Sequence, residues 1–337
     1  MGPTAENARL GGMADRIRWG ILSTGSIASK FAEDLRLLPD AELAAVGSRS
    51  AETAERFAER HGVARAHGSW QALVEDPEVD AIYVATPHTA HYEATRLSLG
   101  AGKATLTEKP FTLDVASAEA LVETARSSGV FLMEAMWMRC FPAIRRIAGL
   151  IADGAIGDLV SVHADFGMEG PVEETHRLRS RALGGGGLYD VGIYPVTFAH
   201  LFLGAPTEIQ AWARMSPGGV DENTGMLFGF ASGAVAALTC SLIGDSARRA
   251  TITGTTGRIE VPRNFFCPSE FTLWHGEQPE RFEMPFEGWG YHFEAAEVQR
   301  CLREGLTESP LIPLSETLEI LRVLDVVRIK VGLDYTA

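Results

Sequence analysis

The feature of this sequence that most constrains its fold is a regular alternation of short apolar runs with helical patterns, which continues to about residue 140. The apolar runs indicate strands, and the segments between them repeat apolar residues at helical spacing. This alternation predicts an α/β fold with a doubly wound parallel sheet and right-handed crossovers. The expected strands are Ile17–Leu22, Glu42–Val46, Ala81–Ala85, the run that ends at Lys109, and Val130–Met133, and the expected helices are Ser26–Leu38, Ala51–His61, Ala90–Ala101 and Val115–Ser127.

The pattern changes after residue 140, where β-rich segments follow one another with Gly and Pro residues between them. Such a succession predicts an α+β domain with a large, mostly antiparallel open sheet, one face of which is available to pair subunits. Segments 170–183 and 265–290 have no readable signature and are interpreted as substrate loops. The β-rich segments are Leu159–Phe166, Glu208–Arg214, Thr224–Phe230, Ala234–Ile243, Arg248–Thr253 and Arg258–Val261.

The composition excludes several classes of partner. The chain has 337 residues, 46% of them hydrophobic, which is enough for a sizeable core and about two domains. Its formal net charge of −14 argues against nucleic acid and anionic membrane surfaces as partners. No run of 18 apolar residues indicates a membrane span. The four cysteines lie far apart without metal-binding spacing, so we expect no zinc site or disulfide framework and a reducing cytoplasm.

The turn after the first expected strand resembles a phosphate-binding fingerprint. Ser23-Thr24-Gly25-Ser26-Ile27-Ala28 matches G-x-G-x-x-A except that Ser23 stands in place of the first glycine. The turn precedes a helix whose first N–H groups are suited to a pyrophosphate, so we expect residues 23–27 to bind one in a Rossmann-type domain. The competing interpretation is a plain tight turn before a helix.

The end of the second expected strand predicts which dinucleotide binds. An acidic residue there would accept a hydrogen bond from the ribose 2′-hydroxyl and repel a 2′-phosphate, but this chain has Gly47-Ser48-Arg49-Ser50. Arg49 offers a planar set of donors suited to phosphate, and Ser48 and Ser50 add hydroxyl donors. The sequence therefore favours NADP, although Arg49 is also interpretable as a solvated surface arginine.

The next two strand ends are expected to meet the nicotinamide. Thr86-Pro87-His88 follows one strand, and His91 lies one helical turn later. Glu108 and Lys109 end the following strand, at the sheet edge where ligands bind in open α/β folds. The histidines are also explained if they only cap or line a helix start. No metal is required, because hydride transfer places the difficult chemistry on the cofactor.

A lysine, a carboxylate and a phenol are candidates for the chemistry. Asp190 and Tyr194 follow the glycines Gly184–Gly187 and share a face if their segment is helical. A lysine beside a tyrosine favours the phenolate, which suits proton transfer to or from an alcohol or carbonyl oxygen. Three alternatives stay open: Lys109 as a surface residue, Asp190 as only a helix N-cap, and Tyr194 as a core residue, with Pro195 an awkward neighbour in a helix.

Five motifs in order resemble the glucose–fructose oxidoreductase/inositol dehydrogenase/MocA (Gfo/Idh/MocA) family, over a region from about residue 17 to the C-terminus. Glu134–Arg139 and Glu294–Val298 are similar to its dimeric dihydrodiol dehydrogenase and NADP-dependent D-xylose dehydrogenase branch, whereas inositol-type members carry a histidine at the position of Tyr194. The five motifs are Gly20–Ala28, Ala85–His91, Glu108–Pro110, Met133–Arg139 and Gly185–Tyr194.

The resemblance implies roles for several residues. It implies that Lys109 and Tyr194 form the proton-transfer pair with support from Asp190. It also implies that Trp137 and Phe166 line an aromatic substrate pocket, although Trp137 is alternatively a core residue. Arg139, Asp190 and Tyr194 are further expected substrate contacts. The resemblance implies a homodimer, or possibly a tetramer, that pairs through the second sheet.

These inferences divide the chain and predict its activity. We expect a disordered or artificially added leader (1–16), an NADP-binding Rossmann domain (17–140), a substrate and dimerisation domain (141–312), and a C-terminal helix that packs back on the first domain (313–337). The predicted activity is NADP-dependent oxidation of a secondary alcohol, or reduction of a ketone, on a sugar-like or cyclic diol substrate. The alternatives are an NADPH-dependent ketoreductase of nucleotide or anhydro sugars, and an NADP-binding sensor or co-regulator without turnover.

Overall fold

The computed structural model describes residues 16–170, 173 and 176–335, so the expected leader lies outside the described residues except for Arg16. The chain separates into two compact units, and each is built from segments that are distant in the sequence. The first unit comprises residues 1–111, 118–137 and 287–314, and the second comprises residues 112–117, 138–286 and 315–337.

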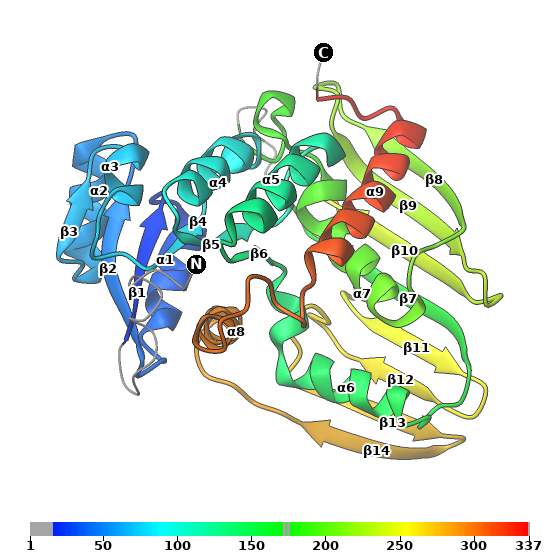
Figure 1. Ribbon diagram of the computed structural model, residues 1–337. Helices are drawn as coiled ribbons and strands as arrows, with labels where there is room; N and C mark the ends of the chain where they lie inside the picture. The colour runs from blue at the N-terminus through cyan, green and yellow to red at the C-terminus, as the bar shows by residue number, and fades with distance from the viewer. Residues whose placement is uncertain (1–15, 171–172, 174–175, 336–337) are drawn as a thin grey trace. The chain divides into compact units, whose positions relative to one another are not determined.

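A six-stranded parallel sheet forms the centre of the first unit (Figure 1). Its strand order is β3-β2-β1-β4-β5-β6, so the direction of winding reverses between β1 and β4. The predicted doubly wound parallel sheet is confirmed, and the reversal marks the point where such sheets bind ligands. The strands are β1 (Ile17–Leu22), β2 (Ala41–Gly47), β3 (Arg65–His67), β4 (Ala81–Val84), β5 (Ala104–Glu108) and β6 (Leu132–Ala135).

The helices of the first unit agree with the predicted ones except at three places. The first expected helix ends at Leu35 instead of Leu38. The elements β3 and α3 were not predicted, because a three-residue strand and a five-residue helix are too short to show a period. The helix α8 was also not predicted. The helices are α1 (Ser26–Leu35), α2 (Ala51–His61), α3 (Trp70–Val74), the 3-10 turn η2 (His88–Ala90), α4 (His91–Gly100), α5 (Val115–Ser128) and α8 (Tyr291–Arg303).

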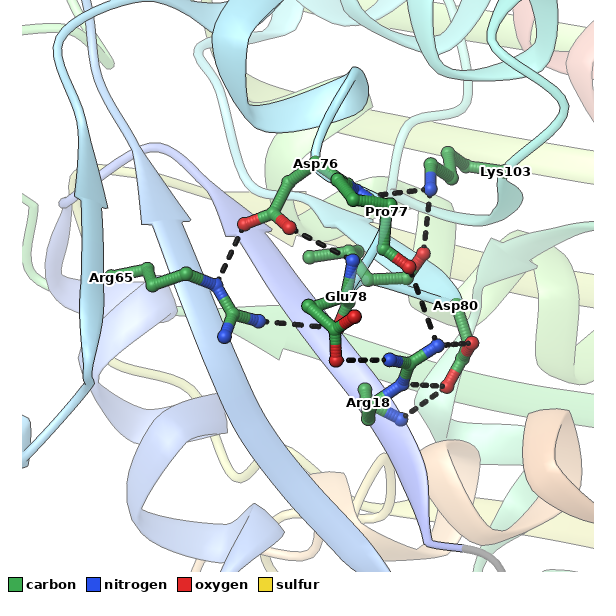
Figure 2. A network of polar contacts seen from close by, with 8 residues as sticks. Arg18, Arg65, Asp76, Pro77, Glu78, Asp80 and Lys103 are labelled. Atoms are coloured by element: carbon green, nitrogen blue, oxygen red, sulfur yellow. Dashed lines mark hydrogen bonds and ion pairs between the residues drawn. The ribbon is translucent and has the colours of Figure 1, made fainter.

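Charged side chains form a network at the amino ends of β1 and β4 (Figure 2). The guanidinium group of Arg18 binds Asp80 through two contacts, Nε to Oδ2 at 2.9 Å and Nη2 to Oδ1 at 2.7 Å, and the Arg18 N–H also donates to Oδ2 at 2.9 Å. Arg65 donates from Nε to Asp76 Oδ2 at 2.8 Å. The ammonium group of Lys103 donates to the backbone oxygens of Asp76 at 2.8 Å and Val79 at 2.7 Å. The chain therefore supplies its own partners for these charges at this edge.

An eight-stranded sheet forms the centre of the second unit, in the order β14-β13-β12-β11-β7-β10-β9-β8. Only β7 and β10 pair in parallel, which confirms a mostly antiparallel sheet. The strands β13 and β14 lie in segment 265–290, so interpreting that whole segment as loop was wrong; the polar, exposed residues of β14 gave no alternating pattern. The strands are β7 (Leu159–Gly167), β8 (Glu208–Met215), β9 (Asp221–Gly229), β10 (Val235–Ser241), β11 (Ala250–Gly254), β12 (Arg258–Val261), β13 (Glu270–His275) and β14 (Gln278–Glu283).

The second unit also contains three main helices. These are α6 (Pro142–Ala152), α7 (Ile193–Leu203) and most of α9 (Leu314–Val331). Short turns η3 (Trp137–Cys140), η4 (Arg181–Leu183) and η5 (Leu188–Gly192) precede α6 and α7. The last helix, α9, buries an apolar stripe made of Leu318, Leu321, Leu324 and Val327. None of the helices in the described part of the chain is long and apolar enough to cross a membrane.

The division into units differs from the expected domains at two segments. Residues 287–314 group with the first unit, although we expected them within the domain 141–312. The physical reason lies in α8, where the Gln299 side-chain oxygen accepts a hydrogen bond from Trp19 Nε1 on β1 at 3.3 Å. Residues 315–337, which we expected to form a separate part, group with the second unit.

Candidate active site

The turn between β1 and α1 leaves backbone donors available at the carboxyl edge of the first sheet. Ser23 has a φ of 121°, a conformation that glycine adopts more easily, which explains why the fingerprint has glycine there. A Cβ atom placed on Gly25 would meet nothing within 4 Å. The first helical bond runs from Ser29 N–H to Gly25 O at 3.1 Å, so the N–H groups of Ser26 and Ile27 precede the helical ladder. This open turn fits a phosphate-containing ligand.

The end of β2 presents Arg49 to solvent. Arg49 is exposed and has no ion-pair partner among the described residues. Thr53, which the sequence analysis did not single out, donates its hydroxyl proton to Ser50 O at 3.0 Å and lies 2.6 Å from Ser48 Oγ. Ser48 must therefore donate to Thr53 in that pair, so its proton is already used. Ser50 is the N-cap residue of α2, and its side chain makes no capping hydrogen bond. Arg49 and Ser50 are therefore better placed than Ser48 to donate to a phosphate.

The loop after β4 is largely buried. Thr86 and His88 are buried, and the Thr86 hydroxyl has no hydrogen-bond partner among the described residues. His91 is completely buried, with Nε2 2.9 Å from Thr86 O and Nδ1 2.8 Å from Pro110 O. Both ring nitrogens of His91 thus face backbone carbonyls, a contact that the sequence could not reveal because it joins two loops.

Lys109 follows β5 directly, as predicted, and is half-buried. The carboxylate of Glu108 accepts hydrogen bonds from the Tyr83 hydroxyl and from the Lys109 N–H, the latter at 3.1 Å. Burial and the charge of Glu108 raise the pKa of Tyr83, which therefore remains a donor. Glu108 thus holds the backbone of Lys109. Tyr83 was not predicted, although a tyrosine within the otherwise aliphatic run Ala81–Val84 is the sequence signal that could have indicated it.

A second buried carboxyl lies on α8 in the same unit. Glu294 is completely buried, and neither of its side-chain oxygens has a hydrogen-bond partner among the described residues. Burial, together with the charges of Glu108 and Asp34, raises its pKa well above the ordinary value.

The glycine-rich turn before η5 is held by a buried aspartate. Gly186 has a φ of 119°, and a Cβ atom there would collide with Asp221 Oδ1. Asp221 accepts hydrogen bonds from Leu188 N–H at 2.8 Å and from the Thr224 hydroxyl at 2.7 Å, and burial raises its pKa. The turn therefore needs glycine because the backbone passes directly over this carboxyl group.

Asp190 and Tyr194 lie on consecutive turns of one helical segment. Asp190 is the third residue of the π turn η5, whose N-cap position is Gly187, so the interpretation of Asp190 as only an N-cap is wrong. Pro195 lies in the first turn of α7, where the missing N–H costs least. Both predicted residues are buried, and Asp190 Oδ1 accepts from Arg177 Nη1 at 3.1 Å, a partner that was not predicted.

An aromatic cluster surrounds Tyr194 in the second unit. Its ring centroid lies 5.5 Å from Phe166, which was predicted, and 5.2 Å from Phe266, which was not. Phe166 and Phe266 stack with centroids 4.3 Å apart and planes 5° apart. Phe266 lies in the segment interpreted as loop. This cluster offers flat apolar surfaces beside a phenol.

Two further predicted substrate residues have partners within their own units. Trp137 is buried and stacks on Tyr291 with ring centroids 4.4 Å apart and planes 11° apart. Arg139 is buried and forms an ion pair from Nη1 to Glu316 Oε2 at 2.5 Å, whereas its Nε has no hydrogen-bond partner among the described residues.

Comparisons with known proteins match both units. The profile of the "Oxidoreductase family, NAD-binding Rossmann fold" matches residues 17–136, and that of the "GFO/IDH/MocA C-terminal domain" matches residues 144–260. The chain is 38% identical to trans-1,2-dihydrobenzene-1,2-diol dehydrogenase of Mus musculus and 37% identical to that of Homo sapiens, each over 95% of this chain and 98% of the relative.

Solved structures give a similar picture. A 3-ketoreductase from Actinomadura kijaniata, in complex with NADP and TDP-benzene, has a TM-score of 0.84 and 30% identity over 94% of this chain and 98% of its own. An aldose-aldose oxidoreductase from Caulobacter crescentus has a TM-score of 0.84 and 25% identity over the same shares.

Proposed function

The chain belongs to the Gfo/Idh/MocA family of oxidoreductases, and from this premise we propose that it is an NADP-dependent dehydrogenase of a sugar-like or cyclic diol substrate. The observation that carries the proposal is the carboxyl edge of the six-stranded sheet, where Gly25 is open and Arg49 has no ion-pair partner among the described residues. The dihydrodiol dehydrogenase relatives support a substrate with a secondary alcohol.

The residues at this edge fit a dinucleotide with a 2′-phosphate. Residues 23–27 would hold the pyrophosphate through backbone N–H groups, and Arg49 and Ser50 would hold the 2′-phosphate. The loop 86–88, with Glu108 and Lys109, would border the nicotinamide. When bound, the cofactor supplies the hydride acceptor or donor.

We assign the proton transfer to Tyr194 and the charge stabilisation to Lys109. In the direction of oxidation, the phenolic oxygen of Tyr194 takes the hydroxyl proton, and the ammonium group of Lys109 stabilises the developing oxyanion. Asp190, fixed by Arg177 at 3.1 Å, supports this pair. The stacked rings of Phe166 and Phe266 favour a cyclic substrate or the apolar face of a sugar. Trp137 is proposed as a further lining residue.

A second candidate reaction is the reduction of a ketone on a nucleotide-linked sugar. The structural relative from Actinomadura kijaniata is a 3-ketoreductase in complex with TDP-benzene, and this favours the candidate. The two reactions use the same chain residues in opposite directions. Product analysis with NADP and a diol, and separately with NADPH and a ketosugar nucleotide, distinguishes them.

The outer face of the second sheet supports a homodimer. Trp212 on β8 is 69% exposed and Leu227 on β9 is 54% exposed, and Val235 on β10 is exposed beside them. Leu227 is paired with Ala237 and Gln210, so one sheet face presents adjacent apolar positions. A Trp212→Asp, Leu227→Asp variant is expected to be monomeric by light scattering, whereas Ile329→Asp on α9 should leave the mass unchanged. Equal masses for both variants and the unmodified protein would contradict this interface.

A reducing compartment is consistent with the state of the cysteines. Cys140, Cys240, Cys267 and Cys301 are all thiols, and three of them are buried. We therefore propose the cytoplasm as the site of action.

The proposed function is tested by a substrate screen with purified protein. Diols, polyols and aldoses are supplied with NADP or NAD, and reduced cofactor is followed by its absorbance. Turnover of a diol or aldose with preference for NADP is expected. No turnover with any of them, together with no binding of NADPH by fluorescence titration, would contradict the proposal.

A further inference from the structure

His91 connects two loops at the carboxyl edge of the first sheet. It begins α4, is completely buried, and lies between Thr86 O at 2.9 Å from Nε2 and Pro110 O at 2.8 Å from Nδ1. Thr86 follows β4 and Pro110 follows Lys109 after β5. One side chain therefore touches both a loop proposed to border the nicotinamide and the residue next to the proposed catalytic lysine.

The backbone around Lys109 is held by buried side chains in three places. Glu108 accepts from Lys109 N–H at 3.1 Å, His91 meets Pro110 O at 2.8 Å, and Glu134 accepts from Phe111 N–H at 3.2 Å. His91 also reaches the loop after β4, through its contact with Thr86 O at 2.9 Å. The position of a side chain depends on the backbone that carries it. These contacts therefore fix the backbone position from which the Lys109 side chain extends.

The protonation state of His91 limits what its ring can do. Burial lowers the pKa of His91 to about 4, and the nearby charge of Lys109 acts in the same direction, while the two carbonyl groups oppose it. At neutral pH the ring therefore carries one proton and donates to one of the two carbonyls. The two contacts can have different importance, and they can be separated by mutation.

We propose that His91 is a positioning residue, which places Lys109 through Pro110 O and places the loop of Thr86 through its other nitrogen. The proposal rests on the proposed function, in which Lys109 acts on the substrate oxygen and the Thr86 loop borders the cofactor. A displacement of about 1 Å at a reacting group can cost roughly 100-fold in rate. The effect of His91 on catalysis is thus expected to exceed its effect on binding.

Two substitutions separate the contacts. His91→Asn places an amide NH2 donor where Nδ1 was, facing Pro110 O, whereas His91→Gln places one where Nε2 was, facing Thr86 O. We expect His91→Gln to lower kcat by roughly 100-fold with little change in the Kd of NADPH. We expect His91→Asn to keep kcat near that of the unmodified protein and to raise the Kd of NADPH by about 10-fold, as for one lost hydrogen bond.

His91→Phe removes both ring nitrogens and so the one N–H donor of the ring, and Thr95→Val is the matched control. Thr95 lies on the same helix and bonds Thr107 on the same strand at 2.7 Å, away from the strand end. His91→Phe should show both defects, while Thr95→Val should lower the melting temperature and leave kcat and Kd unchanged. Equal losses of kcat in the Asn and Gln variants, or an unchanged kcat in His91→Phe, would overturn the proposal.

The test also separates this proposal from the proposed function. If the unmodified protein turns over a substrate and Lys109→Met does not, the proposed function stands and the His91 variants decide the positioning role. If no substrate is turned over, the proposed function fails. The rate at which Lys109 is acetylated, measured by peptide mass spectrometry, then decides. A rate that differs from that of the unmodified protein in His91→Gln and His91→Phe, but not in His91→Asn, supports the positioning role. Equal rates in all these proteins overturn it.

Discussion

At the amino edge of the six-stranded sheet, Arg18, Arg65 and Lys103 bind carboxylates and carbonyls of the chain itself (Figure 2). At the carboxyl edge, by contrast, Arg49 has no ion-pair partner among the described residues. The Thr86 hydroxyl, also at the carboxyl edge, is buried without a partner in the described part of the chain. Both edges end the same strands and carry similar residue types. The comparison teaches that polar groups without partners in the fold indicate where a ligand binds. A polar group that is buried without a hydrogen bond costs free energy, unless a ligand supplies the missing partner.

The largest expected effect compares two lysines on opposite edges. Lys109→Met should reduce turnover by a factor on the order of 10²–10⁴ while the protein stays folded, because it removes the charge that stabilises the developing oxyanion. Lys103→Met, at the amino edge, should leave turnover unchanged and lower the melting temperature. Steady-state kinetics and thermal unfolding measure both variants. Near-normal turnover in Lys109→Met would contradict the proposal that the reaction takes place at the carboxyl edge.

The second prediction extends the comparison to the proton carrier in the second unit. Tyr194→Phe keeps the ring beside Phe166 and deletes only the hydroxyl, so turnover should fall by about 10²-fold or more with little loss of thermal stability. Asp190→Asn should be milder, because asparagine keeps the size and one acceptor for Arg177. The pH–rate profile of each variant is the measurement. If Tyr194→Phe were active and Asp190→Asn inactive, the role of proton carrier would have to be assigned to the Asp190 carboxylate.

The third prediction compares two arginines. Arg49→Ala should weaken NADP binding by roughly 1.5–3 kcal/mol, or about 10- to 150-fold in Kd, because a charge-assisted contact to the 2′-phosphate is lost. Its affinity for NAD should barely change. Arg65→Ala removes an arginine of the same domain that already binds Asp76, and it should change neither affinity. Calorimetric titrations with both cofactors test this; equal affinities of the unmodified protein for NADP and NAD would show that Arg49 does not select the phosphate.

The fourth prediction concerns the stability that the amino edge contributes. Asp80→Asn removes the charge of a carboxylate bound by Arg18 Nε at 2.9 Å and Nη2 at 2.7 Å. It should lower the free energy of unfolding by about 1–2 kcal/mol, since both side chains are partly exposed and the pair is partly screened. The Kd of NADPH should stay the same. A loss of cofactor affinity without a loss of stability would contradict the separation of the two edges.

The smallest effect is a dependence of stability on acid pH. Burial opposes ionisation, but the hydrogen bonds from Arg18 lower the pKa of Asp80, and those from Glu78 N–H, His67 and Arg65 lower that of Asp76. A carboxyl group with a lowered folded pKa stabilises the fold above the unfolded value of about 3.9, and this stabilisation is lost as pH falls below it. In urea unfolding at pH 6, 4 and 3, the free energy of unfolding should therefore decrease less with falling pH in Asp80→Asn than in the unmodified protein. A loss as steep as that of the unmodified protein would exclude Asp80 as the cause.

The sequence predicted those features that depend on neighbours in the chain. The alternation of strands and helices, the turn at Ser23, and the exposed Arg49 after β2 are local patterns, and the structure contains them where they were expected. The partners it missed are distant in sequence: Tyr83 binds Glu108, and Arg177 binds Asp190. No period or motif encodes such pairs, because they arise only when separate segments pack together.

Two other differences have different causes. Ser48 was expected to offer its hydroxyl proton to phosphate, but Thr53 receives that proton at 2.6 Å. The segment interpreted as loop contains β13 and β14 as well as Phe266, which lies against Tyr194. The polar, exposed residues of β14 show no alternation, whereas Phe271 and Leu273 of β13 alternate with polar residues and are buried, so the pattern for β13 was present and was missed.

The discontinuous first unit has a consequence for synthesis on the ribosome. Asp34 on α1 accepts backbone hydrogen bonds from Trp289 at 2.8 Å and Tyr291 at 2.7 Å, and Trp19 on β1 donates to Gln299. When the first half of the chain emerges, these early residues have no partners yet. A nascent chain that stops before residue 287 therefore exposes a buried tryptophan and a buried carboxylate, and such surfaces recruit chaperones. The first unit is completed only after residues 287–314 have been synthesised.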